Sequence, residues 1–113
     1  MDLECQLDKP FISRLQRAKA NLIWQDPAYQ RQAHHMPHVD SFESGAESFI
    51  YYVNTTDAPT KFFNQSGDVV HTQESVAGCG VLFDSQTYHA GSSPTDTPYR
   101  VVLNFVFSPR RRK

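Results

Sequence analysis

Residues 49–64, FIYYVNTTDAPTKFFN, decide the fold class of this 113-residue chain. Two short runs rich in aromatic and β-branched residues, FIYYVN and TKFFN, flank the polar cluster NTTDAPT. Runs of this length and composition, separated by turn-forming residues, are typical of β-strands. The stretch therefore predicts two consecutive strands joined by a turn.

The same pattern continues toward the C-terminus. Further strand-like runs are DVVHT at 68–72, GCGVLFD at 78–84 and YRVVLNFVF at 99–107. Turn clusters such as NQSGD and AGSSPTDTP lie between them. Frequent short strands with polar turns indicate an antiparallel barrel or sandwich over about residues 30–108, rather than a βαβ fold.

The segment before this barrel has a different periodicity. In DKPFISRLQRAKANL, residues 8–22, the apolar side chains Phe11, Leu15, Ala18 and Leu22 recur at helical spacing after an Asp-Lys-Pro start. Proline near the first turn suits a helix N-terminus. We expect an amphipathic helix over about residues 8–24 that supports the barrel.

Size and composition predict a single domain over residues 1–113. The formal net charge of −1 gives no electrostatic case for nucleic acid, although residues 109–113 form a basic tail ending in RRRK. No apolar run approaches the roughly 18 residues of a membrane span. With two cysteines, Cys5 and Cys79, and no zinc-ligand pattern, we expect a reduced, cytoplasmic setting without membrane contact. The oligomeric state is not indicated.

The motif HVD at 38–40 places two potential metal ligands on one face of a strand. Alternate strand residues point to the same side, so His38 and Asp40 can face one cavity while Val39 faces away. His34 and His35 lie nearby, but adjacent side chains diverge, so at most one of them can face that cavity.

A third ligand is expected from a remote strand, because a barrel brings distant strands together at its mouth. His89 follows an apolar run and precedes a Gly-Ser-Ser-Pro loop, where ligands at strand ends are often found. Two histidines and one carboxylate leave three coordination positions open, as in non-haem Fe(II) oxygenases. Dioxygen can take one position and an organic co-substrate the other two.

Arg100 opens the last strand-like run. With period-2 alternation it shares a face with Val102 and Asn104. If that face is the barrel interior, the buried guanidinium is unpaired, which is costly and implies an anionic guest. Its planar fork suits a carboxylate.

Together these residues resemble the 2-oxoglutarate- and Fe(II)-dependent dioxygenases, in particular their prolyl-hydroxylase-like branch. The resemblance covers roughly residues 32–107 and rests on five motifs in the family's order: HVD, IYYVN at 50–54, PTKFF at 59–63, GVLFDSQTYHAG at 80–91 and YRVVLNFVF. It implies a double-stranded β-helix, also called a jelly roll or cupin-like barrel.

The resemblance also implies roles for individual residues. His38, Asp40 and His89 correspond to the family's iron ligands, and Arg100 to the arginine that binds the far carboxylate of 2-oxoglutarate. Tyr52 corresponds to a tyrosine that often bonds the same carboxylate, and Asn104 occupies a position that can line the co-substrate pocket. The implied activity couples decarboxylation of 2-oxoglutarate by dioxygen to hydroxylation of an unidentified substrate, a peptide or a small molecule.

The chain departs from the family at two places. Ala58-Pro59-Thr60 stands where the family usually has Gly-Gly-Thr, a change expected to alter the turn but to touch no ligand. Only 37 residues precede the HVD motif, fewer than is common in the family. Two alternatives therefore stay open: a cupin-like module that binds or isomerises a ligand without redox chemistry, and a catalytically inactive interaction domain.

Overall fold

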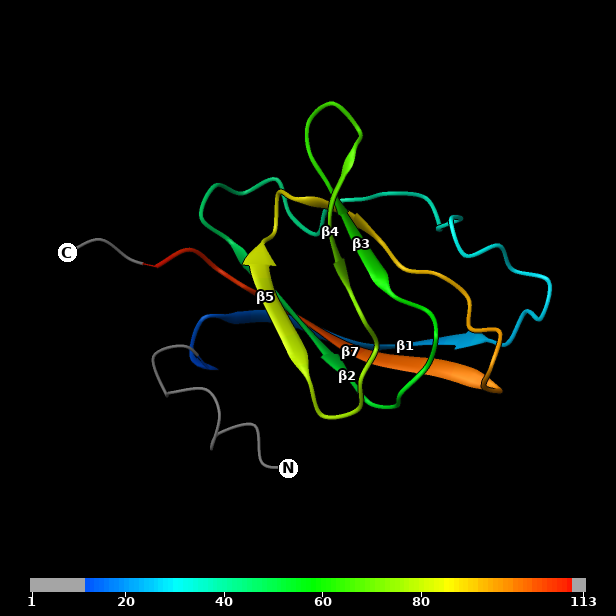
Figure 1. Cartoon of the computed structure of the whole chain (residues 1–113). Coiled ribbons are helices and arrows are strands. Elements are labelled where there is room, and N and C mark those ends of the chain that lie inside the picture. The colour runs from blue at the N-terminus through cyan, green and yellow to red at the C-terminus, as the bar shows by residue number, and fades with distance from the viewer. Residues whose placement is uncertain (1–11, 111–113) are drawn as a thin grey trace.

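Two antiparallel β-sheets make up the fold (Figure 1). The computed structural model describes residues 12–110. One sheet has the strand order β1-β7-β2-β5 and the other β4-β3-β6. The strands of this described part are β1 (Leu15–Trp24), β2 (Glu47–Tyr52), β3 (Thr60–Phe63), β4 (Val69–Gln73), β5 (Gly80–Asp84), β6 (Tyr88–Ala90) and β7 (Tyr99–Phe107).

The predicted helix over residues 8–24 is wrong over Leu15–Trp24. Residues 8–11 lie outside the described residues, and Leu15–Trp24 forms β1 instead. β1 pairs antiparallel with β7 along its length, from Leu15 opposite Phe107 to Trp24 opposite Tyr99 (Figure 1). Helix propensity is a weak prior, and the backbone partners that β7 offers override it.

The two sheets pack face to face through alternate residues of their strands. Ile50 and Tyr52 of β2 and Val102 of β7 form the buried cluster of the four-stranded sheet. Across the interface, Phe83 of β5 meets Phe62 of β3 edge to face, with ring centroids 4.9 Å apart. This alternation confirms the predicted strands and turns Arg100, two residues before Val102, toward the interior, where it is 3% exposed.

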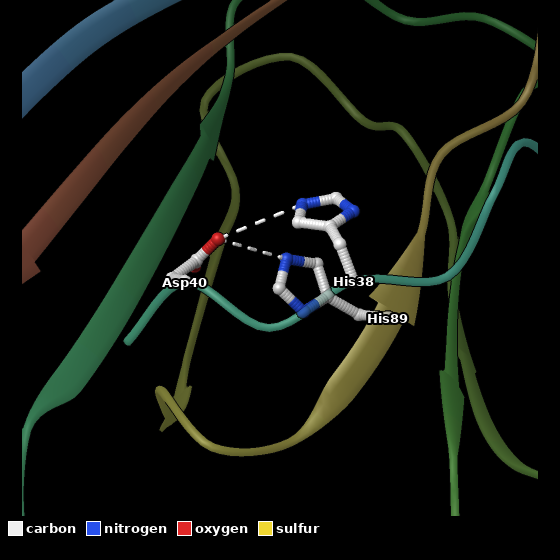
Figure 2. Close-up of side chains that lie close together, drawn as sticks. All are labelled: His38, Asp40 and His89. Carbon is white, nitrogen blue, oxygen red and sulfur yellow. Dashed lines mark ion pairs between the residues drawn. The ribbon is translucent and has the colours of Figure 1, made fainter. Parts of the chain in front are cut away.

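The connection between β1 and β2 carries the HVD motif along the open side of β6. His38 and His89 form an isolated antiparallel bridge, which extends the three-stranded sheet by one residue pair. The HVD motif thus lies at the open edge of the three-stranded sheet, beside β6 (Figure 2). Across residues 12–110, no helical segment has the length and hydropathy needed to cross a membrane.

Candidate metal and anion-binding site

Backbone pairing brings the two histidines together. The N–H of His38 donates to the carbonyl of His89 at 2.9 Å, and the N–H of His89 donates back at 2.9 Å. Residues paired this way present their side chains on the same face. The two imidazole centroids consequently lie 4.3 Å apart, although the residues are far apart in the sequence.

Asp40 completes the cluster, two residues beyond His38. Its N–H donates to the carbonyl of Ser85 at 3.0 Å, which anchors the motif to the turn before β6. Its Oδ1 lies 3.6 Å from Nε2 of His38 and 3.4 Å from Nε2 of His89 (Figure 2). The three ligand atoms all lie within 4.8 Å of one another, close enough to hold one metal ion.

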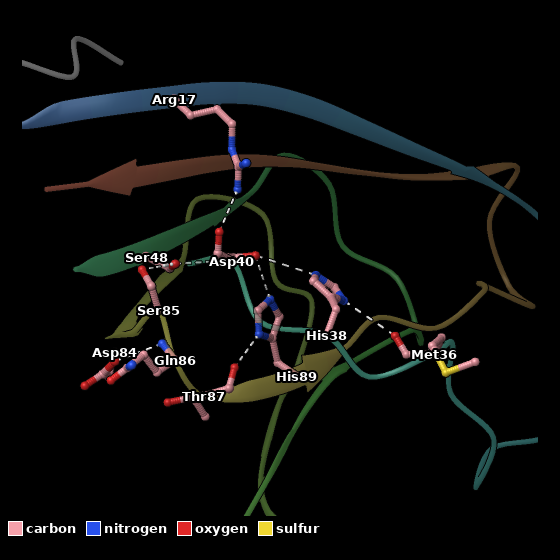
Figure 3. Close-up of polar contacts among 10 residues, drawn as sticks. All are labelled: Arg17, Met36, His38, Asp40, Ser48, Asp84, Ser85, Gln86, Thr87 and His89. Atoms are coloured by element: carbon pink, nitrogen blue, oxygen red, sulfur yellow. Dashed lines mark hydrogen bonds and ion pairs between the residues drawn. The ribbon is translucent and has the colours of Figure 1, made fainter. Parts of the chain in front are cut away.

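Backbone carbonyls orient both imidazoles. Nδ1 of His89 lies 2.9 Å from the carbonyl of Thr87, and Nδ1 of His38 lies 3.5 Å from that of Met36 (Figure 3). A carbonyl can only accept, so the tautomer with its proton on Nδ1 satisfies both contacts and leaves each Nε2 lone pair free for a metal. This is the arrangement by which outer partners orient metal-binding histidines.

Two buried serines orient the carboxylate. Ser48 Oγ donates to Asp40 Oδ2 at 2.6 Å, and Ser85 Oγ lies 2.7 Å from Ser48 Oγ (Figure 3). Oδ2 is thus engaged, while Oδ1 faces the imidazoles. Sequence reasoning missed both serines, although the inward register of Ser48 on β2, two residues before Ile50, was a usable signal.

The pKa directions favour metal binding near neutral pH. Burial raises the pKa of Asp40, but the contacts of its carboxylate with His89, Ser48 and His38 outweigh burial, and the net pKa lies below the ordinary value. Burial, and next the charge of His89, lower the pKa of His38. A carboxylate and a neutral imidazole are the forms that coordinate metals. Two imidazole nitrogens and one carboxylate oxygen fit the donor set of non-haem Fe(II) sites.

A cavity of about 340 Å³ opens beside both histidines. Its lining also includes Arg100, Thr60 and Asn104. Among the buried side-chain atoms of residues 12–110, the Oδ1 of Asn104 has no hydrogen-bond partner. The two histidines of the candidate metal site and the predicted anion-binding arginine therefore line one cavity.

Arg100 is buried without a counter-charge. Its Nε donates to the carbonyl of Ala58 at 3.0 Å and its NH2 to Oγ1 of Thr60 at 2.8 Å, both neutral acceptors. Within the described part of the chain, no carboxylate lies at ion-pair distance from it. Burial lowers the pKa of its guanidinium. The third nitrogen, NH1, faces Gly91, where a Cβ atom would lie 3.3 Å away.

Tyr52 lies behind the cavity wall. It is completely buried, its hydroxyl donates to Oγ1 of Thr60 at 2.8 Å, and the guanidinium carbon of Arg100 lies 5.8 Å from its ring centre. Tyr52 is not among the residues that line the cavity. Thr60, in contrast, does line the cavity.

His34 and His35 diverge, as the alternation rule predicts. His35 lines the cavity and places Nε2 3.0 Å from Ser93 Oγ. His34 instead packs against Phe63, with ring centroids 4.9 Å apart, in a separate pocket. One of the two therefore faces the cavity.

Comparison with solved structures establishes the fold. A cupin protein from Bacteroides fragilis superposes with a TM-score of 0.57 at 10% identity, over 85% of this chain and 68% of that one. The fold is a cupin-like jelly roll. No protein-family model and no curated protein matches the sequence.

Two enzymes share this jelly roll. A Pseudomonas putida prolyl-4-hydroxylase matches with a TM-score of 0.56 at 23% identity, over 88% of this chain and 55% of the hydroxylase. A structure of the enzyme HppE with Fe(II) and an alternative substrate matches with a TM-score of 0.50 at 12% identity. The match covers 80% of this chain and 42% of HppE. The jelly roll thus spans about half the length of these enzymes, and identities this low establish the fold alone.

Proposed function

We propose that this chain is an Fe(II)- and 2-oxoglutarate-dependent dioxygenase that hydroxylates a C–H bond, in the manner of the prolyl hydroxylases. The observation that carries the proposal is a cavity lined both by His38 and His89, which cluster with Asp40, and by an uncompensated buried arginine. A metal site alone suits any cupin. A buried guanidinium without a carboxylate partner calls in addition for an anionic guest.

Each group of residues at the site would have its own role in binding the metal or the co-substrate. His38, Asp40 and His89 would hold Fe(II) through two imidazole nitrogens and one carboxylate oxygen, leaving positions open toward the cavity. Arg100 would bind the distal carboxylate of 2-oxoglutarate, which directs its 2-oxo acid end toward the metal. Ser48 and the carbonyls of Thr87 and Met36 would keep the ligand atoms aimed, because each fixes the far side of a ligand.

When bound, Fe(II) supplies the redox chemistry: dioxygen converts 2-oxoglutarate to succinate and CO2, and one oxygen atom enters the substrate C–H bond as a hydroxyl. The primary substrate is a peptide or a small molecule that reaches the metal through the same cavity. His35 and the exposed Met36 line that cavity and can contact it.

Anaerobic titration of the Fe(II)-loaded protein with 2-oxoglutarate tests this function. Chelation of iron by a 2-oxo acid produces a weak visible charge-transfer band, and we expect a saturable band. Bound iron without a band would favour the cupin-like module without redox chemistry. Failure to bind iron would favour the catalytically inactive interaction domain.

A further inference from the structure

Two exposed cations lie on the inner face of β1, next to the cavity. Residues directly opposite each other in an antiparallel pair have their side chains on the same face. Arg17 lies opposite Val106, and Lys19 lies opposite Asn104. Val106 is 4% exposed and Asn104 lines the cavity, so both cations are on the face of β1 that is turned toward the other sheet. The cavity lining begins two residues further along this face, at Asn21.

Both cations lie close to the metal cluster. NH2 of Arg17 donates to the carbonyl of Asp40 at 3.2 Å, and Figure 3 shows the side chain extending from β1 toward that residue. Burial, and next the charge of His89, lower the pKa of His38, and the positive charge of Lys19 acts in the same direction. The two cations therefore border the metal cluster on its solvent side.

Neither cation is neutralised by a carboxylate. Within residues 12–110, no ion pair includes Arg17 or Lys19. Glu43 reaches this part of β1, but its Oε1 accepts a hydrogen bond from Gln16 at 3.3 Å. An exposed cation needs no partner, but two cations on one face beside a reaction site attract an anionic guest.

The spacing along β1 indicates the form of that guest. Arg17 and Lys19 are two residues apart, about 6.6 Å on a strand, and acidic side chains at alternate positions of an extended peptide have the same spacing. Ile23, which lies opposite Arg100, is a further four residues or about 13 Å along the strand from Lys19. A co-substrate held between Arg100 and the metal therefore leaves both cations free for a second, longer molecule.

We propose that the primary substrate is a peptide with acidic residues at alternate positions, and that Arg17 and Lys19 bind those carboxylates and orient the reacting residue at the metal site. This inference rests on the proposed function, because it names the substrate of the same site. Arg17 and Lys19 are then specificity-determining residues, whereas Arg100 remains assigned to the co-substrate.

The test compares how the protein, loaded with Fe(II) and 2-oxoglutarate in the absence of oxygen, retains two pools of nonapeptides. Both pools have random positions drawn from glycine, alanine, serine, leucine and proline. One pool has glutamate at two alternate positions, and the other has glutamine there. Peptides retained on ultrafiltration are quantified by mass spectrometry. The proteins are the wild type, the double variant Arg17→Gln with Lys19→Gln, and Arg31→Gln, which changes an exposed arginine outside the cavity lining.

We expect the wild type and Arg31→Gln to retain the glutamate pool about 2- to 30-fold better than the glutamine pool, the range for two exposed ion pairs. The double variant should retain both pools equally, and added salt should reduce the preference of the wild type. Equal retention of the pools by the wild type, retention of neither, or an unchanged preference in the double variant overturns the inference and leaves the proposed function intact. The charge-transfer titration with 2-oxoglutarate, performed on the same proteins, reports the proposed function separately. If the wild type gives no band, that function fails and the inference fails with it.

A second variant keeps the inference testable if loss of the hydrogen bond from Arg17 to Asp40 disturbs the metal cluster. Lys19→Glu reverses the charge of an exposed side chain. We expect it to retain less of the glutamate pool than the wild type, and more of a third pool with lysine at the two alternate positions. Fe(II) affinity is measured in parallel, to show that the metal cluster is intact. An unchanged order of preference among the three pools would overturn the inference.

Discussion

Two histidines of the metal-ligand cluster line the same cavity as Arg100, but the charges of the cluster and of the guanidinium are balanced in different ways. The carboxylate of Asp40 receives a hydrogen bond from Ser48 and lies within 3.6 Å of two imidazoles. The guanidinium has only neutral acceptors, Ala58 and Thr60. The first site is thus organised by the protein itself, whereas the second depends on a guest for its counter-charge.

This difference implies that the two sites can be disabled separately. A change in the metal cluster should remove the metal and leave the distal anion-binding group in place. A change at Arg100 should weaken the binding of the guest anion and leave metal binding unchanged. If either change disables both sites, the division between them is wrong.

The largest effect is expected from Asp40→Ala. This variant removes the carboxylate that both imidazoles approach, and Fe(II) affinity should fall by more than about 100-fold, since loss of even an outer partner of a ligand costs 10- to 100-fold. Equilibrium dialysis with metal analysis measures the loss. Far-UV circular dichroism should show the wild-type spectrum, because the backbone bridge between His38 and His89 remains.

Arg100→Leu should have the next largest effect, with the opposite selectivity. Affinity for 2-oxoglutarate should fall by about 100-fold, within the range for removing one partner of a buried charged contact, while Fe(II) affinity is retained. The melting temperature without ligand should not fall, because an uncompensated buried charge is removed. Arg31→Leu, which changes an exposed arginine, is the matched control and should bind like the wild type. If Arg100→Leu kept the wild-type affinity for 2-oxoglutarate, Arg100 would not be the residue that binds the anion.

Periodicity predicted the parts of this site that depend on a single strand. The two-residue alternation places His38 and Asp40 on one side and Arg100 on one face with Val102 and Asn104, and the structure shows that this face is buried at Arg100. Thr60 and Ser48 could not be assigned in this way, because their partners come from other strands. Thr60 binds Arg100 of the opposite sheet, and Ser48 binds the loop that carries Asp40.

β1 was mispredicted for a related reason. LQRAKANLIW contains good helix formers, and most of its side chains are exposed in β1, so their burial contributes little to the choice of conformation. What determines its conformation is the backbone ladder to β7, a partner about 80 residues later in the chain. The local amino-acid composition of this segment therefore does not predict its pairing with β7.

Ser48→Ala tests how the hydrogen bond from Ser48 to Asp40 contributes to metal binding. Fe(II) affinity should fall by about tenfold, as expected when an outer hydrogen-bond partner of a ligand is lost. Ser48 lowers the pKa of Asp40, so its removal should raise that pKa and let protons compete with the metal at higher pH. The acid limb of Fe(II) binding should therefore shift upward in pH, as measured by titration across pH 4–7. An unshifted limb with weaker binding would mean that Ser48 acts through packing alone.

Gly91→Ala should have the smallest effect. That effect should be confined to the guanidinium of Arg100. The added Cβ would lie 3.3 Å from NH1 of Arg100, a contact tight enough to displace the guanidinium by a few tenths of an ångström. We expect 2-oxoglutarate affinity to fall by about two- to fivefold, a modest cost for overpacking against a flexible side chain. Fe(II) affinity should not change, and neither should the binding of 2-oxopentanoate, a 2-oxo acid of the same chain length that ends in a methyl group, because neither depends on the position of Arg100. A loss shared by both 2-oxo acids would instead place Gly91 against the part of the ligand next to the metal, and the separation of the two sites within the cavity would have to be redrawn.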